Sequence, residues 1–191
     1  MIPRPGDVLL FEKLPGWHWG SWAPFLIRLV TGNKVTHTGL VAARTPEGRV
    51  IYWDSNPGGV RRRVLEPGSA ISSNGLVATK IARPRFAGAP MAADVREWAW
   101  TMDKAPYSYR RILNLAALHL GWRFKPDWAP RRPLFGNGNP RASICSDFVT
   151  RWLQTRSERY WSGRPEWTIE PDDFLQSSLF QVMPFTNGGP A

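Results

Sequence analysis

Three polar residues far apart in the chain have the chemistry of a nucleophilic hydrolase site. Cys145 is the single cysteine, and it lies in the segment SICSDFVTRWL, whose apolar spacing predicts a helix. The unpaired N–H groups and the positive dipole end at a helix start stabilise a thiolate and could form part of an oxyanion hole. His37 is the candidate base for this thiol, and Asp54 is the candidate acid that orients the imidazole.

Each of these residues also has an ordinary structural interpretation. An isolated cysteine is most often a small buried hydrophobic residue, and a single histidine on a strand is more often structural than catalytic. Asp54 could instead cap the turn at Ser55-Asn56-Pro57-Gly58, where its strand ends. The hypothesis of a site therefore depends on whether the three side chains meet in the fold.

The element that carries His37 and Asp54 is predicted to be an antiparallel hairpin. Segments 36–43 and 49–55 are rich in β-forming residues, and Arg-Thr-Pro-Glu-Gly separates them. A four-residue loop at 45–48 would set Arg44 opposite Arg49.

This register brings the two candidate partners together. It sets His37 opposite Asn56 and places Asp54 one diagonal away on the same face, at roughly 7–8 Å. Gly39, opposite Asp54, is expected to leave open space for both side chains. Asn56 is the reserve candidate for the orienting group.

The remaining elements surround this hairpin in an α+β arrangement. Further strands are expected at 8–11, 60–65, 76–81 and 179–185, and helices at 21–30, 91–102, 107–120, 144–153 and 171–178. Strands precede helices along the chain, which is typical of an α+β domain. One domain over 1–191 is expected, with a long Pro-, Arg- and aromatic-rich loop at 121–142.

Composition narrows the classes of partner. The net charge of +10 and the pI near 10.6 favour an anionic partner. No phosphate loop, zinc finger or RNP-like motif is present, so specific nucleic-acid binding is not expected. A single cysteine and three scattered histidines give no metal-ligand spacing, and neither metal nor cofactor is expected. No long apolar run or secretory signal is seen, so cytoplasmic synthesis without a signal peptide or transmembrane segment is expected.

A series of short motifs runs through most of the chain in a characteristic order. They are PGDVLLF, VTG, THTGLV, VIYWDS, GGV, APYSY, ICSDFV and EPDDF, and together they cover about 6–174. In this order they resemble the circularly permuted NlpC-type papain-like cysteine hydrolases. The resemblance implies a six-stranded, barrel-like antiparallel sheet flanked by helices. It also implies that Cys145 is the nucleophile, His37 the base and Asp54 the orienting acid, at a position where the family more often has Glu.

Three further residues are considered for the substrate pocket. Tyr107 matches a tyrosine that is common before the cysteine helix in the family, although an aromatic residue at a helix start is more often there for packing. Trp53, beside the candidate acid, and His18, in the aromatic segment GWHWGSW, are candidate substrate-binding residues, and for His18 packing is the main alternative. His119, in LNLAALHL, is expected to be a core or helix-end residue.

The resemblance and the charge together predict a cysteine hydrolase that cleaves amide bonds in peptidoglycan stem peptides, with an anionic cell-wall polymer or peptide as its partner. One alternative is an acyl hydrolase or acyltransferase acting on lipids or thioesters. Another is a non-catalytic structural module of a phage tail that contacts other virion proteins. An enzyme that cleaves the cell wall but has no secretion signal must reach the wall by another route. A phage-encoded, virion- or lysis-associated protein is therefore expected.

Overall fold

The fold is known from a computed structural model of the chain, which describes residues 2–13, 32–72, 75–85, 92–124, 133–135, 139–157, 160–161, 164 and 168–187. Over these residues the chain is an α+β protein with one six-stranded antiparallel sheet and four helices, which confirms the predicted class. The strands are β1 (Val8–Lys13), β2 (Val35–Arg44), β3 (Val50–Asn56), β4 (Gly59–Leu65), β5 (Leu76–Pro84) and β6 (Phe180–Pro184). The helices are α2 (Ala92–Thr101), α3 (Tyr109–Phe124), α4 (Cys145–Arg156) and α5 (Asp173–Gln176).

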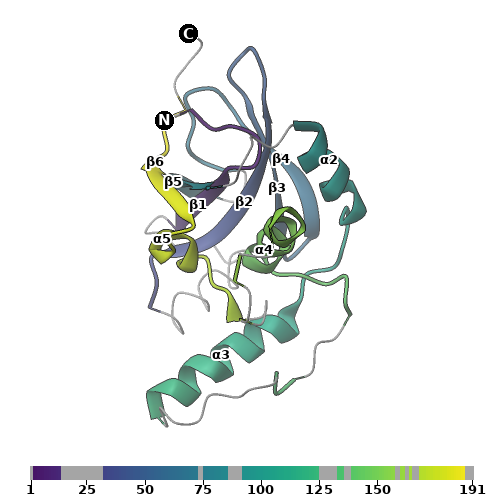
Figure 1. The fold of residues 1–191 in the computed structure, drawn as a ribbon, viewed down its shortest axis with the longest axis vertical. Helices are drawn as coiled ribbons and strands as arrows, with labels where there is room; N and C mark the ends of the chain where they lie inside the picture. Colours follow the sequence, from purple (N-terminus) through teal and green to yellow (C-terminus); the bar gives the residue numbers. More distant parts are fainter. Residues whose placement is uncertain are drawn as a thin grey trace.

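The strands follow the order β4-β3-β2-β1-β5-β6 across the sheet. Figure 1 shows α2 and α4 beside β2, β3 and β4, whereas α3 extends away from the sheet and α5 lies next to β6. The expected helix at 21–30 lies outside the described residues. The expected loop at 121–142 is wrong at its start, because α3 continues to Phe124. Gly121 does not end this helix, and proline, which would, first occurs at Pro126.

Buried side chains form a separate cluster on each face of the sheet. Successive strand residues point to opposite faces, so neighbouring residues join different clusters. On one face Leu40 and Trp53 pack with Trp152 of α4. On the other face Phe11 and Tyr52 belong to the second cluster. The inner strands β1, β2 and β3 are therefore buried on both sides, as the continuous apolar run at 8–11 predicts for β1.

The β2–β3 hairpin has a different register at its turn from the one predicted. Thr45 N–H donates to the Arg49 carbonyl at 2.9 Å, so the turn closes at this pair and Arg44 faces Val50. A bulge between Val41 and Ala43 then shifts the pairing by one residue. Beyond the bulge the register is the predicted one, with Leu40 opposite Trp53.

The hairpin strands part beyond Leu40 and Trp53, where their ladder ends. From there β2 continues to pair with β1, with His37 opposite Phe11, while β3 continues to pair with β4, with Asp54 opposite Arg61. The segment that leads into α4 packs against β3 beyond this point. Ser55 Oγ donates to the Ser143 carbonyl at 2.8 Å, two residues before the helix begins. The start of α4 is thereby fixed where β2 and β3 diverge.

Candidate active site

His37 and Asp54 meet where β2 and β3 diverge. His37 Nε2 lies 2.9 Å from Asp54 Oδ2, and the two side chains are only 6% and 2% exposed. At this distance, and out of solvent, the pair is a charge-assisted hydrogen bond when the imidazole is protonated. The predicted contact between base and acid is present, and it forms between side chains beyond the end of the ladder.

The second oxygen of Asp54 is held by two other groups. Asn56 Nδ2 donates to Oδ1 at 3.1 Å, and Arg63 Nε donates to the same atom at 3.3 Å. Asn56 Oδ1 also accepts the Gly58 N–H at 2.9 Å, so Asn56 caps the turn, the role that was the alternative for Asp54. Of the two candidates for the orienting group, Asp54 contacts the imidazole and Asn56 contacts Asp54. The carboxylate is thus fixed on one side and offers its other oxygen to His37.

Gly39 has a different role from the one predicted. A Cβ at this position would lie 2.6 Å from Tyr52 Cδ2, so the aromatic ring already fills the space expected to be open. Tyr52 in turn contacts Phe11, whose ring lies 5.6 Å from the ring of His37. Gly39 is therefore a close-packing position, and the rings that it admits form an apolar wall beside the imidazole.

Cys145 is the first residue of α4 and lies next to His37. The thiol is buried, with 1% of the residue exposed. Burial alone would raise the pKa of Cys145, but the charge and hydrogen bond of His37, together with the backbone of Thr38, lower it below its ordinary value. Because Asp54 occupies Nε2 of His37, the nitrogen available to the thiol is Nδ1.

The pKa of His37 responds in the opposite direction. Burial alone would lower it, but the Cys145 thiolate and the Asp54 carboxylate raise it to about 10. A lowered thiol pKa beside a raised imidazole pKa favours a thiolate–imidazolium pair over two neutral groups. The start of the helix favours the same state, because Ile144 at the N-cap position provides no side-chain cap that would compete for the first N–H groups.

Tyr107 lies beside the thiol. Its pKa is raised well above its ordinary value, first by burial and then by the negative charge of Cys145. The backbone holds it there, since Tyr107 bridges to Ser143 just before α4. Its ring contacts that of Tyr109, with centroids 5.2 Å apart. Tyr107 is thus placed where a pocket residue would be, and its role in substrate binding stays a prediction.

The other candidate residues lie away from the thiol or outside the described chain. Trp53 is 4% exposed and belongs to the core cluster beneath α4, on the opposite face of β3 from Asp54. This position favours packing, and substrate binding by Trp53 has no support from its surroundings. His18 lies outside the described residues. Within the described part of the chain, no group of three or more His, Cys, Asp or Glu residues could hold a metal ion.

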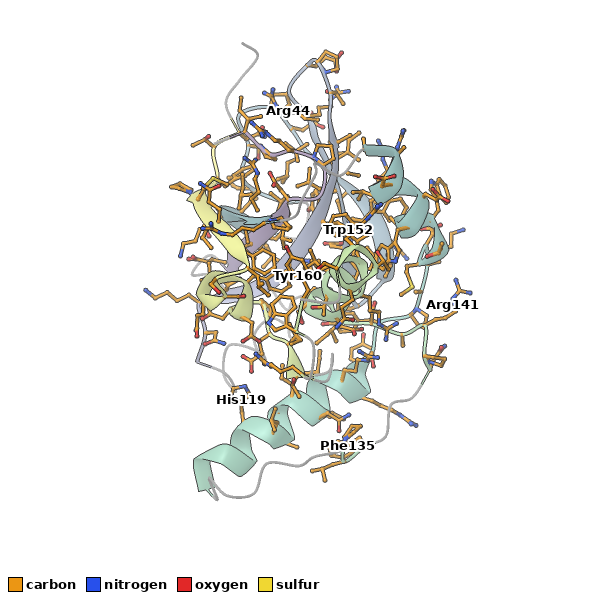
Figure 2. All side chains as sticks on the ribbon, in the orientation of Figure 1. Arg44, His119, Phe135, Arg141, Trp152 and Tyr160 are labelled. Atoms are coloured by element: carbon orange, nitrogen blue, oxygen red, sulfur yellow. The ribbon has the colours of Figure 1, made fainter. Side chains whose placement is uncertain are left out.

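His119 forms a separate polar contact. Its Nε2 contacts Glu170 Oε1, and Asn33 Nδ2 donates to the other oxygen of Glu170 at 2.8 Å. Figure 2 shows His119 on α3, on the side that faces the rest of the molecule. The contact joins α3 to the start of β2 and to the segment before α5, so His119 has a structural role at the helix surface where a core or helix-end position was predicted.

Sequence reasoning missed two residues that contact the site. Arg63 holds Asp54, and Thr38 contacts the sulfur of Cys145. The signal for Arg63 was present, because the Asn56-Pro57-Gly58-Gly59 turn fixes β3 against β4 and sets Asp54 opposite Arg61, one diagonal from Arg63. Thr38 had no such signal, since its contact depends on where α4 docks.

No helix in the described part of the chain is both long and apolar enough to cross a membrane. Comparisons of the chain with family models, with curated proteins and with solved structures found no match.

Proposed function

We propose that this chain is a cysteine hydrolase in which Cys145 is the nucleophile, His37 the acid–base group and Asp54 the orienting acid. The observation that carries the proposal is the buried line of three groups from Asp54 through His37 to Cys145, with the thiol at the start of a helix. The pKa of Cys145 is lowered and that of His37 is raised, and a thiolate nucleophile near neutral pH needs both shifts. The motif order noted above supports the same roles and a permuted papain-like fold.

The chemistry follows from the two charged groups. The Cys145 thiolate attacks the carbonyl carbon of an amide, and the electron pair of the C=O bond moves to the oxygen. N–H groups at the start of α4 are suited to stabilise that oxyanion. When the intermediate collapses, the C–N bond breaks and His37 gives its proton to the leaving nitrogen. A water molecule then attacks the thioester and gives a proton to His37, and the thiolate leaves as the acid product forms.

The proposed substrate is the stem peptide of peptidoglycan. The resemblance to permuted NlpC-type hydrolases supports an amide bond, and the net charge of +10 suits an anionic wall polymer. Delivery through a virion or a lysis pore is part of this proposal.

One observation favours a second candidate, an acyl hydrolase or acyltransferase for lipids or thioesters. Tyr107, beside the thiol, stacks edge-on against Tyr109, which is 41% exposed. This pair of rings places aromatic side chains between the thiol and the surface, and aromatic surroundings suit an acyl chain.

The deciding experiment offers purified peptidoglycan, acyl esters and acyl thioesters to the wild type and to Cys145→Ala. Mass spectrometry of the products names the bond that is cut. We expect turnover of one substrate class by the wild type and none by the variant, with the fold preserved. The substitution removes one sulfur from a buried position, which costs about 1–2 kcal/mol in packing, and the loss of the charge interaction with His37 adds to this cost. Activity that survives in Cys145→Ala would refute the catalytic role and favour the non-catalytic structural module.

A further inference from the structure

Within the described part of the chain, α3 has both buried and exposed apolar side chains. Its buried residues Ile112, Leu115 and Leu118 are at most 4% exposed. Tyr109 and Leu113, one turn apart, are 41% and 49% exposed. Exposed apolar side chains on a helix that also carries polar residues such as Arg110 and Asn114 mark a surface that a partner could bind.

A neighbouring segment enlarges this exposed surface. Phe135 N–H donates to Asn114 Oδ1 at 2.9 Å, which holds residues 133–135 along α3. Leu134 and Phe135 are 52% and 48% exposed. Figure 2 shows Phe135 on the side of α3 away from the sheet. We call the four side chains Tyr109, Leu113, Leu134 and Phe135 the α3 face.

The stretch of sequence that contains the α3 face is basic. From 104 to 146 the sequence has eight Lys and Arg residues and one acidic residue, Asp127, so most of the chain's net charge of +10 arises here. Arg110, next to Tyr109, is exposed, and α3 itself contains no acidic residue. Apolar and aromatic residues within a basic helical stretch are the composition that binds at an anionic lipid surface.

Two ion pairs fix the direction of the α3 face. Arg111 binds Asp147 in the first turn of α4, and His119 binds Glu170 farther along the helix. The face therefore cannot turn inward without breaking contacts to the body of the molecule. Tyr109, the first residue of α3, also contacts Tyr107. The α3 face therefore begins at the end of the helix that lies nearest the thiol.

We propose that the α3 face docks on an anionic phospholipid surface. The leucine and aromatic side chains enter the headgroup boundary, and Arg110 binds lipid phosphates. Docking in this way would bring Tyr109, and with it the neighbouring Tyr107, toward the lipid boundary. The docking does not depend on chemistry at Cys145, so it can be tested separately from the hydrolase proposal.

The test is sedimentation of the full chain with vesicles of phosphatidylcholine alone and of phosphatidylcholine with phosphatidylglycerol. We expect binding to the anionic vesicles, little to the neutral ones, and weaker binding at high salt. The variant Leu113→Ser/Leu134→Ser should bind anionic vesicles about tenfold more weakly, because both side chains lose their burial in lipid.

The matched control is Ile71→Ser/Val182→Ser, which changes two exposed aliphatic residues on the strand side of the molecule. This control should bind as the wild type does, and so should Cys145→Ala. Absence of binding to anionic vesicles would overturn the proposal. An equal loss of binding in the control would also overturn it, and so would unchanged binding in Leu113→Ser/Leu134→Ser. In the latter case charge alone would explain the binding, as it would for binding to double-stranded DNA or polyphosphate.

Discussion

The pairing of a buried imidazole with a buried thiol can be measured through the proton affinity of His37. An ordinary histidine has a pKa near 6.5, and that of His37 is raised to about 10. At 1.36 kcal/mol for each pKa unit, the native protein favours the protonated form by on the order of 5 kcal/mol. Since burial acts in the opposite direction, the anions Cys145 and Asp54 must supply more than this.

The informative perturbation is Cys145→Ala. It removes the thiolate, whose charge raises the pKa of His37 more than any other group does. Burial remains, and only Asp54 opposes it. We therefore expect a large fall in the pKa of His37, and a smaller fall in Asp54→Asn.

Nuclear magnetic resonance of the imidazole ring protons provides the measurement, because the chain has only three histidines and His37→Gln assigns the signal. A wild-type His37 that titrates near 6.5, with no change in Cys145→Ala, would show that no thiolate–imidazolium pair exists. The reasoning from burial and charge would then be wrong.

The same pair predicts how stability depends on pH. The raised pKa of His37 stabilises the fold fully below the unfolded value near 6.5, and this contribution is lost as the pH rises through about 10. The lowered pKa of Cys145 contributes above the unfolded thiol value near 8.5, and that contribution is lost as the pH falls. The difference in Tm between wild type and Cys145→Ala should therefore be greatest between about 6.5 and 8.5.

Two further predictions concern neighbouring residues. Arg63→Gln should lower kcat/KM about tenfold on whichever substrate is cut, because Asp54 loses its charged partner at Oδ1. Arg62 lies on the opposite face of β4, so Arg62→Gln should leave kcat/KM unchanged. Equal effects of the two variants would assign the loss to general charge. Gly39→Ala should destabilise the fold by about 1–3 kcal/mol in urea unfolding, because its Cβ meets the Tyr52 ring, and a Tyr52→Leu background should reduce that cost. An additive double variant would contradict the clash.

Local patterns predicted much of the fold and the main contact of the site. Alternating apolar runs located the strands, and hairpin logic brought His37 close to Asp54. The predicted pairing at the turn was wrong by one residue, because Thr45 pairs with Arg49. The bulge near Ala42 then shifts the pairing back by one residue, so the register at Leu40 and Trp53 is the predicted one. No sequence pattern shows a bulge of this kind, since it depends on how the twisted strands accommodate each other.

Contacts that join distant segments could not be predicted from spacing. Thr38 meets Cys145 only because α4 docks against β2, and Trp53 is covered by the same helix. The end of α3 was misplaced because a glycine and a change in composition were taken as a boundary, although neither interrupts the backbone ladder as proline does. Helix docking is a tertiary event, and its energy comes from packing rather than from local preference.

The divergence of β2 and β3 has a consequence for when the thiol becomes reactive. Ser55 and Ser143 are 88 positions apart, and their contact fixes the start of α4 against the hairpin. Contacts with such long loops form late, after local hairpins and helices. A nascent or partly folded chain therefore carries an ordinary, protonated cysteine even when its hairpin already holds His37 against Asp54. In the mechanism that we propose, completion of the fold is therefore the activating step, because the contacts that lower the pKa of Cys145 form only once α4 has docked.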